Sequence, residues 1–289
     1  GYSGIGKTAL VNEMHRAVLA RRGYLLRGKC DQYSRNQPFV ALIQAFGRML
    51  QALAAEGAER RRYWKGRLSD ALGANAGVVA EIIPELGPLL GTTGAPPSLP
   101  PAESEQRFHI AFSQLVAALA SRNHPLLLFV DDLQWADVSS LRLLEYLLRD
   151  DGERSVLVIG AYRDNEVQPH DPLSTTIRSI ERAHGRIERL LLGPLPDEDV
   201  RQLVADTLHA GTGHVAPLAD LCIEKTRGNP FFLGQFLRSL HEQGDITYER
   251  QGGNWTWDLA RIRNRSMTDN VVALLLSKLR TLPAPTRDL

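Results

Sequence analysis

The sequence predicts an α/β fold built on a parallel sheet. Three observations predict it: apolar runs of strand length, helical segments between them, and a glycine-rich segment at the start of the chain. The run at residues 126–130 is apolar at every position, as expected of a parallel strand that is buried on both faces. Because helical segments separate such runs, the order is that of a doubly wound sheet. The predicted strands are residues 23–30, 126–130, 155–162 and 187–192.

The first eight residues carry the strongest motif. Gly1-Tyr2-Ser3-Gly4-Ile5-Gly6-Lys7-Thr8 fits the pattern G-x-x-x-x-G-K-[ST] at every fixed position. In such a loop, glycines let backbone N–H groups point inward at phosphate oxygens. We expect Lys7 to contact the β- and γ-phosphates of a nucleotide, and Thr8 to offer its hydroxyl to Mg²⁺. The alternative is a glycine turn that merely caps the following helix. The expected nucleotide-binding residues are Gly1, Ser3, Gly4, Ile5, Gly6, Lys7, Thr8 and Ala9.

Two features distinguish the predicted core from a minimal nucleotide-binding domain. The strand expected before the loop is missing because the sequence begins at Gly1, so we expect a fragment of a longer protein. A helical insertion at residues 31–124 separates the first two predicted strands. Apolar residues at helical spacing from Phe39 to Leu53 form one stripe and predict a helix in it. Within it, the prolines and glycines of residues 84–101 predict a loop without regular structure.

Charged side chains follow two predicted strands at their carboxyl ends, where ligands bind in such sheets. Asp131 and Asp132 follow one strand and Arg163 follows the next. We expect Asp131 to hold Mg²⁺, Asp132 to polarise the attacking water, and Arg163 to reach the γ-phosphate. In the structural alternative, the two acids begin a turn and Arg163 pairs with Asp164 or Glu166. Asp137 precedes a helical pattern and is predicted to be its N-cap.

The pattern changes after Pro196. Three helical segments predict a small bundle, in which Gly228-Asn229-Pro230 opens the third helix and Pro230 suits its first turn. Ile246-Thr247-Tyr248 and Trp255-Thr256-Trp257 then flank a glycine turn, which predicts a β-hairpin. A last helix is predicted near residues 271–279. The predicted domains are an ATPase core at residues 1–195, a helical lid at 196–244 and a truncated winged-helix-like module at 245–289.

Composition narrows the class of protein. A net charge of +1 gives no global electrostatic field that would attract nucleic acid. A local basic cluster beside two aromatic residues has nucleic-acid binding as its alternative and is interpreted as a solvated helix face. The cluster consists of Arg60, Arg61, Arg62, Lys65 and Arg67. Two cysteines, Cys30 and Cys222, are too few for a disulfide framework and suit a reducing compartment. With no signal peptide and no apolar run of membrane-spanning length, we expect a cytoplasmic protein.

Four segments together resemble a known family, the AAA-type module of signal-transduction P-loop ATPases. The resemblance is closest to the central ATPase region of large bacterial multi-sensor serine/threonine and histidine kinases, and it covers nearly the whole chain. It implies ATP and Mg²⁺, Arg163 as a phosphate sensor, and Pro230 beside the adenine. It also implies partner domains in the same chain: kinase, GAF, PAS and histidine-kinase domains. The segments are Gly1-Tyr2-Ser3-Gly4-Ile5-Gly6-Lys7-Thr8, Asp131-Asp132-Leu133-Gln134-Trp135-Ala136-Asp137, Gly160-Ala161-Tyr162-Arg163-Asp164 and Arg227-Gly228-Asn229-Pro230-Phe231-Phe232.

Three functions are compatible with these residues. The leading hypothesis is an ATP-binding and ATP-hydrolysing switch within a signalling kinase, with self-association as a candidate interaction. The second is the ATPase switch of a large helix-turn-helix transcriptional regulator. The third is a scaffold that holds nucleotide without hydrolysing it. Because the sequence contains no kinase catalytic motif, kinase activity is not assigned to these residues.

Overall fold

The chain divides into two compact units in this computed structural model. One is Lys7–Leu190; the other joins Gly1–Gly6 to Leu191–Leu289. The structure describes residues 1–91, 100–149, 155–183, 186–249 and 253–264.

A three-stranded parallel sheet forms the centre of the Lys7–Leu190 unit. Its strands are β1 (Tyr24–Lys29), β2 (Leu126–Asp131) and β3 (Val156–Gly160), in the order β1-β2-β3. The register aligns Leu26 with Leu128 and Leu128 with Val158, so all three carboxyl ends meet at one edge. The predicted α/β fold class, with its parallel sheet and helical insertion, is confirmed.

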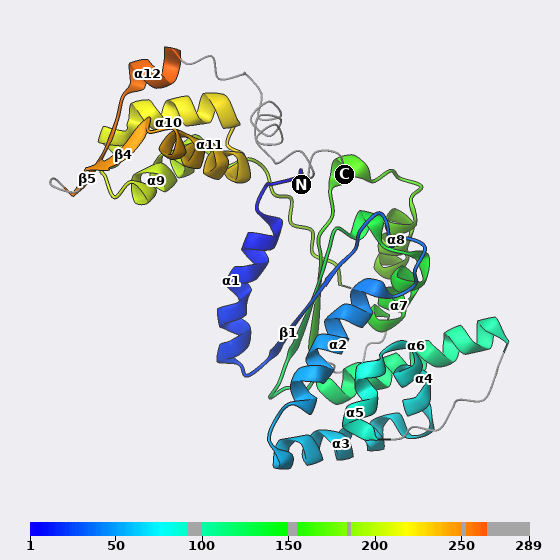
Figure 1. Cartoon of the computed structure of the whole chain (residues 1–289). Coiled ribbons are helices and arrows are strands. Elements are labelled where there is room, and N and C mark those ends of the chain that lie inside the picture. The colour runs from blue at the N-terminus through cyan, green and yellow to red at the C-terminus, as the bar shows by residue number, and fades with distance from the viewer. Residues whose placement is uncertain (92–99, 150–154, 184–185, 250–252, 265–289) are drawn as a thin grey trace, which may run out of the picture. The chain divides into compact units, whose positions relative to one another are not determined.

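The alternation of side chains along β2 explains its continuous apolar run. Leu126, Leu128 and Val130 face the larger hydrophobic core, which they share with the helices of the insertion. Leu127 and Phe129 point to the opposite face and pack with Val11 of α1 (Lys7–Ala20). Successive residues of a strand point to opposite faces, so covering both faces requires an apolar residue at every position. In Figure 1, α1 and α2 (Val40–Ala54) accordingly lie on opposite sides of the sheet.

Helices surround this sheet, and most of them belong to the predicted insertion. Helix α2 buries the predicted apolar stripe, including Leu42, Phe46 and Leu50, each at most 1 % exposed. The remaining elements of this unit are α3 (Ala58–Leu72), η1 (Gly73–Asn75), α4 (Ala76–Ile82), η2 (Pro84–Leu86), α5 (Gly87–Leu90), α6 (Pro101–Leu119), η3 (Leu133–Trp135), α7 (Val138–Leu148), η4 (Asp164–Glu166) and α8 (Pro172–Arg182).

Two local predictions were wrong. Residues 187–192 do not form a strand: they pair with no described strand, and Leu190 and Leu191 are 74 % and 77 % exposed. Residues 84–101 are not all loop, because η2, α5 and the start of α6 lie there, while residues 92–99 lie outside the described part. Each of these three elements has a proline in its first turn, where its missing N–H breaks no helical hydrogen bond.

The second unit combines helices with a hairpin. Val200, Leu218, Leu233 and Leu240 lie in a core that also contains Ile246 of the hairpin. Strands β4 and β5 pair antiparallel, which confirms the predicted hairpin. The predicted helix near residues 271–279 lies outside the described residues, and the lid and winged-helix-like boundaries stay predictions. The elements are α9 (Asp197–Thr207), α10 (Thr212–Thr226), α11 (Pro230–Glu242), β4 (Ile246–Glu249), β5 (Asn254–Trp257) and α12 (Leu259–Asn264).

Candidate functional site

The glycine-rich loop has the backbone that its sequence requires. Gly4 and Gly6 have φ values of +73° and +97°, a region that strongly favours glycine. A Cβ atom on Gly4 would lie 2.9 Å from the Cβ of Phe231, so space as well as conformation favours glycine there. Ile5 is buried, and Gly1 packs against the backbone of Leu192.

Helix α11 holds this loop through its own amino-terminal turn. The Asn229 side chain caps the helix by accepting hydrogen bonds from the backbone N–H groups of Phe231 and Phe232. Its Nδ2 donates to the carbonyl of Ser3 at 3.1 Å, and the N–H of Phe231 donates to the carbonyl of Gly4 at 3.2 Å. Pro230 occupies the first turn, and its Cγ lies 3.8 Å from the position of a Cβ on Gly6. The predicted placement of Pro230 beside an adenine stays a prediction.

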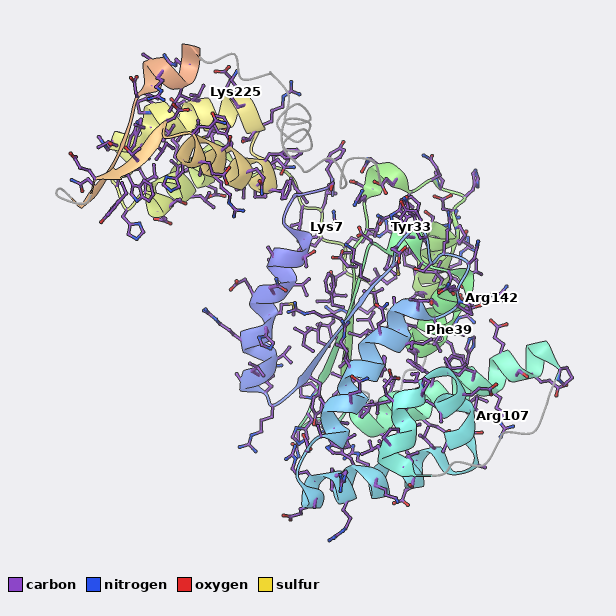
Figure 2. The ribbon with its side chains drawn as sticks, in the orientation of Figure 1. Lys7, Tyr33, Phe39, Arg107, Arg142 and Lys225 are labelled. Carbon is purple, nitrogen blue, oxygen red and sulfur yellow. The ribbon has the colours of Figure 1, made fainter. Side chains whose placement is uncertain are left out.

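Lys7 and Thr8 begin helix α1, where Figure 2 labels Lys7. The first N–H groups of a helix have no partner within it, so this end attracts anions. The hydroxyl of Thr8 donates to Oδ2 of Asp131 at 2.7 Å. Asp131 ends β2, and its Oδ1 accepts from the N–H of Asp132 at 3.0 Å. The structure thus joins two predicted Mg²⁺ ligands that are 123 residues apart in sequence.

These oxygens fit the preference of Mg²⁺. Magnesium binds hard oxygen ligands and is usually held by one or two carboxylates together with phosphate oxygens and water. One hydroxyl and one carboxylate in contact match that donor set. Among the described residues, no group of three or more His, Cys, Asp or Glu side chains could hold a metal ion by itself.

Asp132 has an unusual environment. Its backbone has φ +54°, and its side chain is only 14 % exposed. Oδ2 lies 3.6 Å from Nζ of Lys29, while Oδ1 lies 3.6 Å from Nε of Arg163 and accepts from Nε2 of Gln134 at 3.2 Å. Both carboxylate oxygens therefore face donors.

Arg163 reaches the same edge of the sheet, just beyond β3. Its Nη1 pairs with Oε1 of Glu166 at 2.6 Å, and its backbone N–H donates to Oε1 of Gln134 at 3.2 Å. The ion pair with Glu166, one of the two structural interpretations of Arg163, is thus observed. Its contact with a γ-phosphate stays a prediction.

The acidic edge also affects a buried thiol. Cys30 follows β1 and donates its N–H to the carbonyl of Asp131 at 3.0 Å. Burial, and then the nearby carboxylates led by Asp137, raise the pKa of the Cys30 thiol to about 12. The thiol is therefore protonated at neutral pH, which makes it a poor nucleophile or metal ligand.

Sequence reasoning missed Lys29 and Gln134 as parts of this site. Lys29 ends β1 in register with Asp131, and the signal for it was present: a charged residue ending a strand that is parallel to β2. Gln134 lies in the segment after Asp132, but no pattern indicated that its side chain turns back to the acids. Asp137, as predicted, caps α7 by accepting from the N–H of Ser140 at 2.8 Å.

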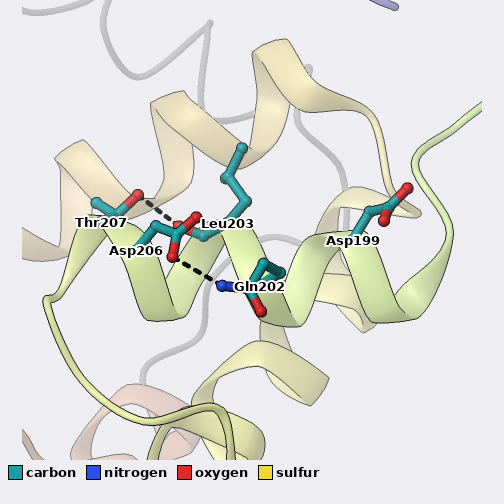
Figure 3. Close-up of a pocket in the computed structure, with 5 residues that line it drawn as sticks. All are labelled: Asp199, Gln202, Leu203, Asp206 and Thr207. Carbon is teal, nitrogen blue, oxygen red and sulfur yellow. Dashed lines mark hydrogen bonds between the residues drawn. The ribbon is translucent and has the colours of Figure 1, made fainter.

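A hollow on the outer face of α9, shown in Figure 3, is a weaker candidate site. Three of its polar side chains already bond within the helix, since Gln202 donates to Asp206 and Thr207 donates to the carbonyl of Leu203. Its lining residues come from that helix alone.

Comparisons with known proteins identify the family of the chain. Residues 1–159, more than half of the chain, match the family model of the AAA ATPase domain, so the chain belongs to that family. The hybrid signal transduction histidine kinase G of Dictyostelium discoideum is 27 % identical over 345 aligned residues. The alignment covers 98 % of this chain but 10 % of that relative, so the chain spans about a tenth of its length. No solved structure matches the chain.

The described helices include none that is both long enough and apolar enough to cross a bilayer.

Proposed function

We propose that this chain is an ATP-binding and ATP-hydrolysing regulatory module of a multidomain cytoplasmic signalling kinase. The hydrogen bond between Thr8 and Asp131 carries the proposal, because it joins the end of the G-x-x-x-x-G-K-T motif to the acidic end of β2. Membership of the AAA ATPase family supports ATP as the ligand. Similarity to the Dictyostelium histidine kinase supports a kinase in preference to a helix-turn-helix regulator.

Each residue has one role in the proposed reaction. The loop from Gly1 to Thr8 binds the phosphates, and Lys7 neutralises charge on the β- and γ-phosphates. Thr8 and Asp131 hold Mg²⁺, which when bound neutralises the charge that develops on the transferred phosphoryl group. Asp132 orients the attacking water and takes up its proton. Arg163 contacts the γ-phosphate and distinguishes ATP from ADP.

Changing Lys7 to Ala tests nucleotide binding. The substitution removes a charge-assisted contact worth about 1.5–3 kcal/mol, so ATP affinity should fall about tenfold or more. The matched control is Lys65→Ala, which removes the same charge from the exposed face of α3. Titration calorimetry with Mg-ATP measures both variants. Equal ATP affinity in Lys7→Ala and the unaltered protein would show that the motif does not bind phosphates.

Phosphate release distinguishes a hydrolysing switch from a scaffold that keeps its nucleotide. We expect slow turnover of ATP by the unaltered protein in the presence of Mg²⁺. Tight ATP binding without phosphate release over many hours would instead support the scaffold.

A further inference from the structure

Four side chains at the carboxyl edge of the sheet form a closed ring. Two donors, the Gln134 amide and the Arg163 guanidinium, alternate with two carboxylates, Asp132 and Glu166. The amide Nε2 of Gln134 reaches Asp132 Oδ1 at 3.2 Å and Glu166 Oε2 at 3.3 Å. The guanidinium of Arg163 reaches the same Asp132 oxygen at 3.6 Å and Glu166 Oε1 at 2.6 Å. The proposed reaction uses Asp132 and Arg163 but assigns nothing to Gln134 or Glu166.

The distances rank the two carboxylates as partners of Arg163. Glu166 lies an ångström closer to the guanidinium than Asp132 does. Glu166 is three positions after Arg163 in sequence, and the 3₁₀ turn η4, which ends at Glu166, keeps the two side chains adjacent. Gln134 also holds Glu166, so the pair is restrained from both sides. The side chains of Arg163 and Glu166 are 30 % and 27 % exposed, which limits the screening of their attraction by water.

We propose that Glu166 is a built-in competitor of the γ-phosphate for Arg163. This inference rests on the proposed function, because it requires ATP at this edge. ATP presents an additional anionic phosphate that can take the guanidinium from Glu166, whereas ADP lacks it. Glu166 therefore sets how strongly the module prefers ATP to ADP.

Opening the ring also changes Asp132. In the closed ring, Oδ1 of Asp132 faces both Gln134 and Arg163, while Lys29 faces Oδ2. When Arg163 turns to the γ-phosphate, Oδ1 loses one of these donors and gains a lone pair for water. Phosphate sensing by Arg163 and activation of water by Asp132 are thereby coupled.

The test is Glu166→Gln, which keeps the size of the side chain and removes its charge. Its matched control is Glu181→Gln, because Glu181 also pairs with an arginine, Arg189 at 2.7 Å, on the surface of the same unit. The chain is titrated with Mg-ADP and with a non-hydrolysable Mg-ATP analogue. We expect Glu166→Gln to bind the analogue about fivefold more tightly, the scale of a partly exposed ion pair, with ADP affinity unchanged. Glu181→Gln should match the unaltered protein with both ligands.

The effect must depend on Arg163. In an Arg163→Ala background, Glu166→Gln should leave the affinity for the analogue unchanged. A general loosening of the fold would instead change that affinity whether or not Arg163 is present. Gln134→Leu, which removes the other restraint on Glu166, provides a second variant. It should shift the ratio of the dissociation constants for ADP and the ATP analogue in the same direction.

If the unaltered protein binds ATP and Glu166→Gln has the same ratio of dissociation constants for ADP and the ATP analogue, the role of Glu166 is overturned and the proposed function is not. An equal gain with and without Arg163 would also overturn the role of Glu166. Absence of ATP binding by the unaltered protein would overturn the proposed function, and the role of Glu166 with it.

Discussion

Asp131 and Asp132 are neighbours in sequence, but their carboxylates face different groups. Asp131 accepts from the hydroxyl of Thr8, whereas Asp132 faces Lys29, Gln134 and Arg163. The backbone of Asp132 is left-handed, with φ +54°, at the point where the two side chains turn to different partners. The difference in partners supports a separate role for each acid in the proposed reaction.

Substituting each acid by asparagine should separate these roles. Asp132→Asn keeps the shape but loses the basic carboxylate, so hydrolysis should slow by about 10²-fold or more with Mg-ATP binding nearly intact. Asp131→Asn should instead weaken the dependence of ATP binding on Mg²⁺, because it removes a hard anionic ligand. Single-turnover hydrolysis and Mg-ATP titration of both variants provide the measurement. Equal losses of binding in the two variants, or normal turnover in Asp132→Asn, would contradict the division.

The two buried thiols make stability depend on alkaline pH. Burial raises the pKa of Cys222 to about 12, and burial with nearby carboxylates does the same for Cys30. The folded chain therefore retains thiol protons that the unfolded chain loses above about pH 8.5, the ordinary pKa of cysteine. Since the unfolded state then binds fewer protons, the free energy of unfolding is unaffected below that pH and falls as pH rises towards 12.

The expected loss is about 1.4 kcal/mol per thiol at one pH unit above the unfolded pKa. Urea unfolding at pH 7.5 and pH 9.5 measures it, with Cys222→Ala as the comparison. The variant should lose less stability between the two pH values than the unaltered protein. The same loss in both would show that the thiol does not contribute.

At the level of elements, Asp137 links α7 to the start of α2. Its Oδ1 accepts from the N–H of Ser140, while Oδ2 accepts from the Ser140 hydroxyl at 2.5 Å and from the N–H of Phe39 at 3.2 Å. Phe39 precedes α2 with φ +65°, a conformation that is unfavourable for a bulky residue, and its ring packs 4.7 Å from that of Phe108. The hydrogen bond from Asp137 helps to hold this strained backbone, so one carboxylate stabilises the beginnings of two helices.

Asp137→Ala should therefore cost more than the loss of an ordinary cap. Removing an N-cap side chain costs about 0.5–2 kcal/mol, and leaving the partly buried N–H of Phe39 without its acceptor adds about 1–3 kcal/mol. The matched control is Asp171→Ala, because Asp171 precedes α8 without making a cap hydrogen bond to it. Chemical denaturation compares the two. A loss for Asp137→Ala no larger than that for Asp171→Ala would contradict the linking role.

Across the whole molecule, each compact unit has its own hydrophobic core. The cores against the two sheet faces belong to residues 7–190, and the core of α9, α10, α11 and the hairpin belongs to the second unit. In the second unit, Asp245 precedes β4 with a fully buried side chain and pairs with Nε of Arg261 at 3.0 Å. This pair links α12 to the segment that follows α11, so its loss should lower the stability of the second unit.

Arg261→Ala tests this local effect. It takes one partner from a buried carboxylate, and we expect a loss of about 1–3 kcal/mol, because Arg261 itself is half exposed. Arg201→Ala is the control, since Arg201 pairs with Asp220 at the surface of the same unit and its loss should be much smaller. Trp255 and Trp257 report on this unit, and Trp64 and Trp135 on the other. Replacing either pair by Phe isolates the signal of the other unit. An equal shift of both units would contradict separate cores.

Local patterns were sufficient for much of the fold. The period of apolar residues predicted α2, the apolar run predicted β2, and turn residues predicted the hairpin, because each depends on neighbours in sequence. The glycine-rich motif could also be recognised from sequence, because its backbone needs positive φ angles that favour glycine. The structure has such angles at Gly4 and Gly6. The cap at Asp137 and the place of Pro230 in the first turn of α11 followed for the same reason.

The arrangement around Asp132 depended on the tertiary fold. Lys29 ends β1, whereas Asp132 and Arg163 follow β2 and β3, and strand register decides which side chains meet at the strand ends. The ring through Gln134 and Glu166 needs the turns η3 and η4 to face each other, which no periodicity reports. Residues 187–192 illustrate the converse: an apolar run forms a strand only beside a strand with free hydrogen-bonding groups, and they pair with no described strand. Backbone preference acts over a few residues, whereas pairing and ion contacts depend on where distant segments lie.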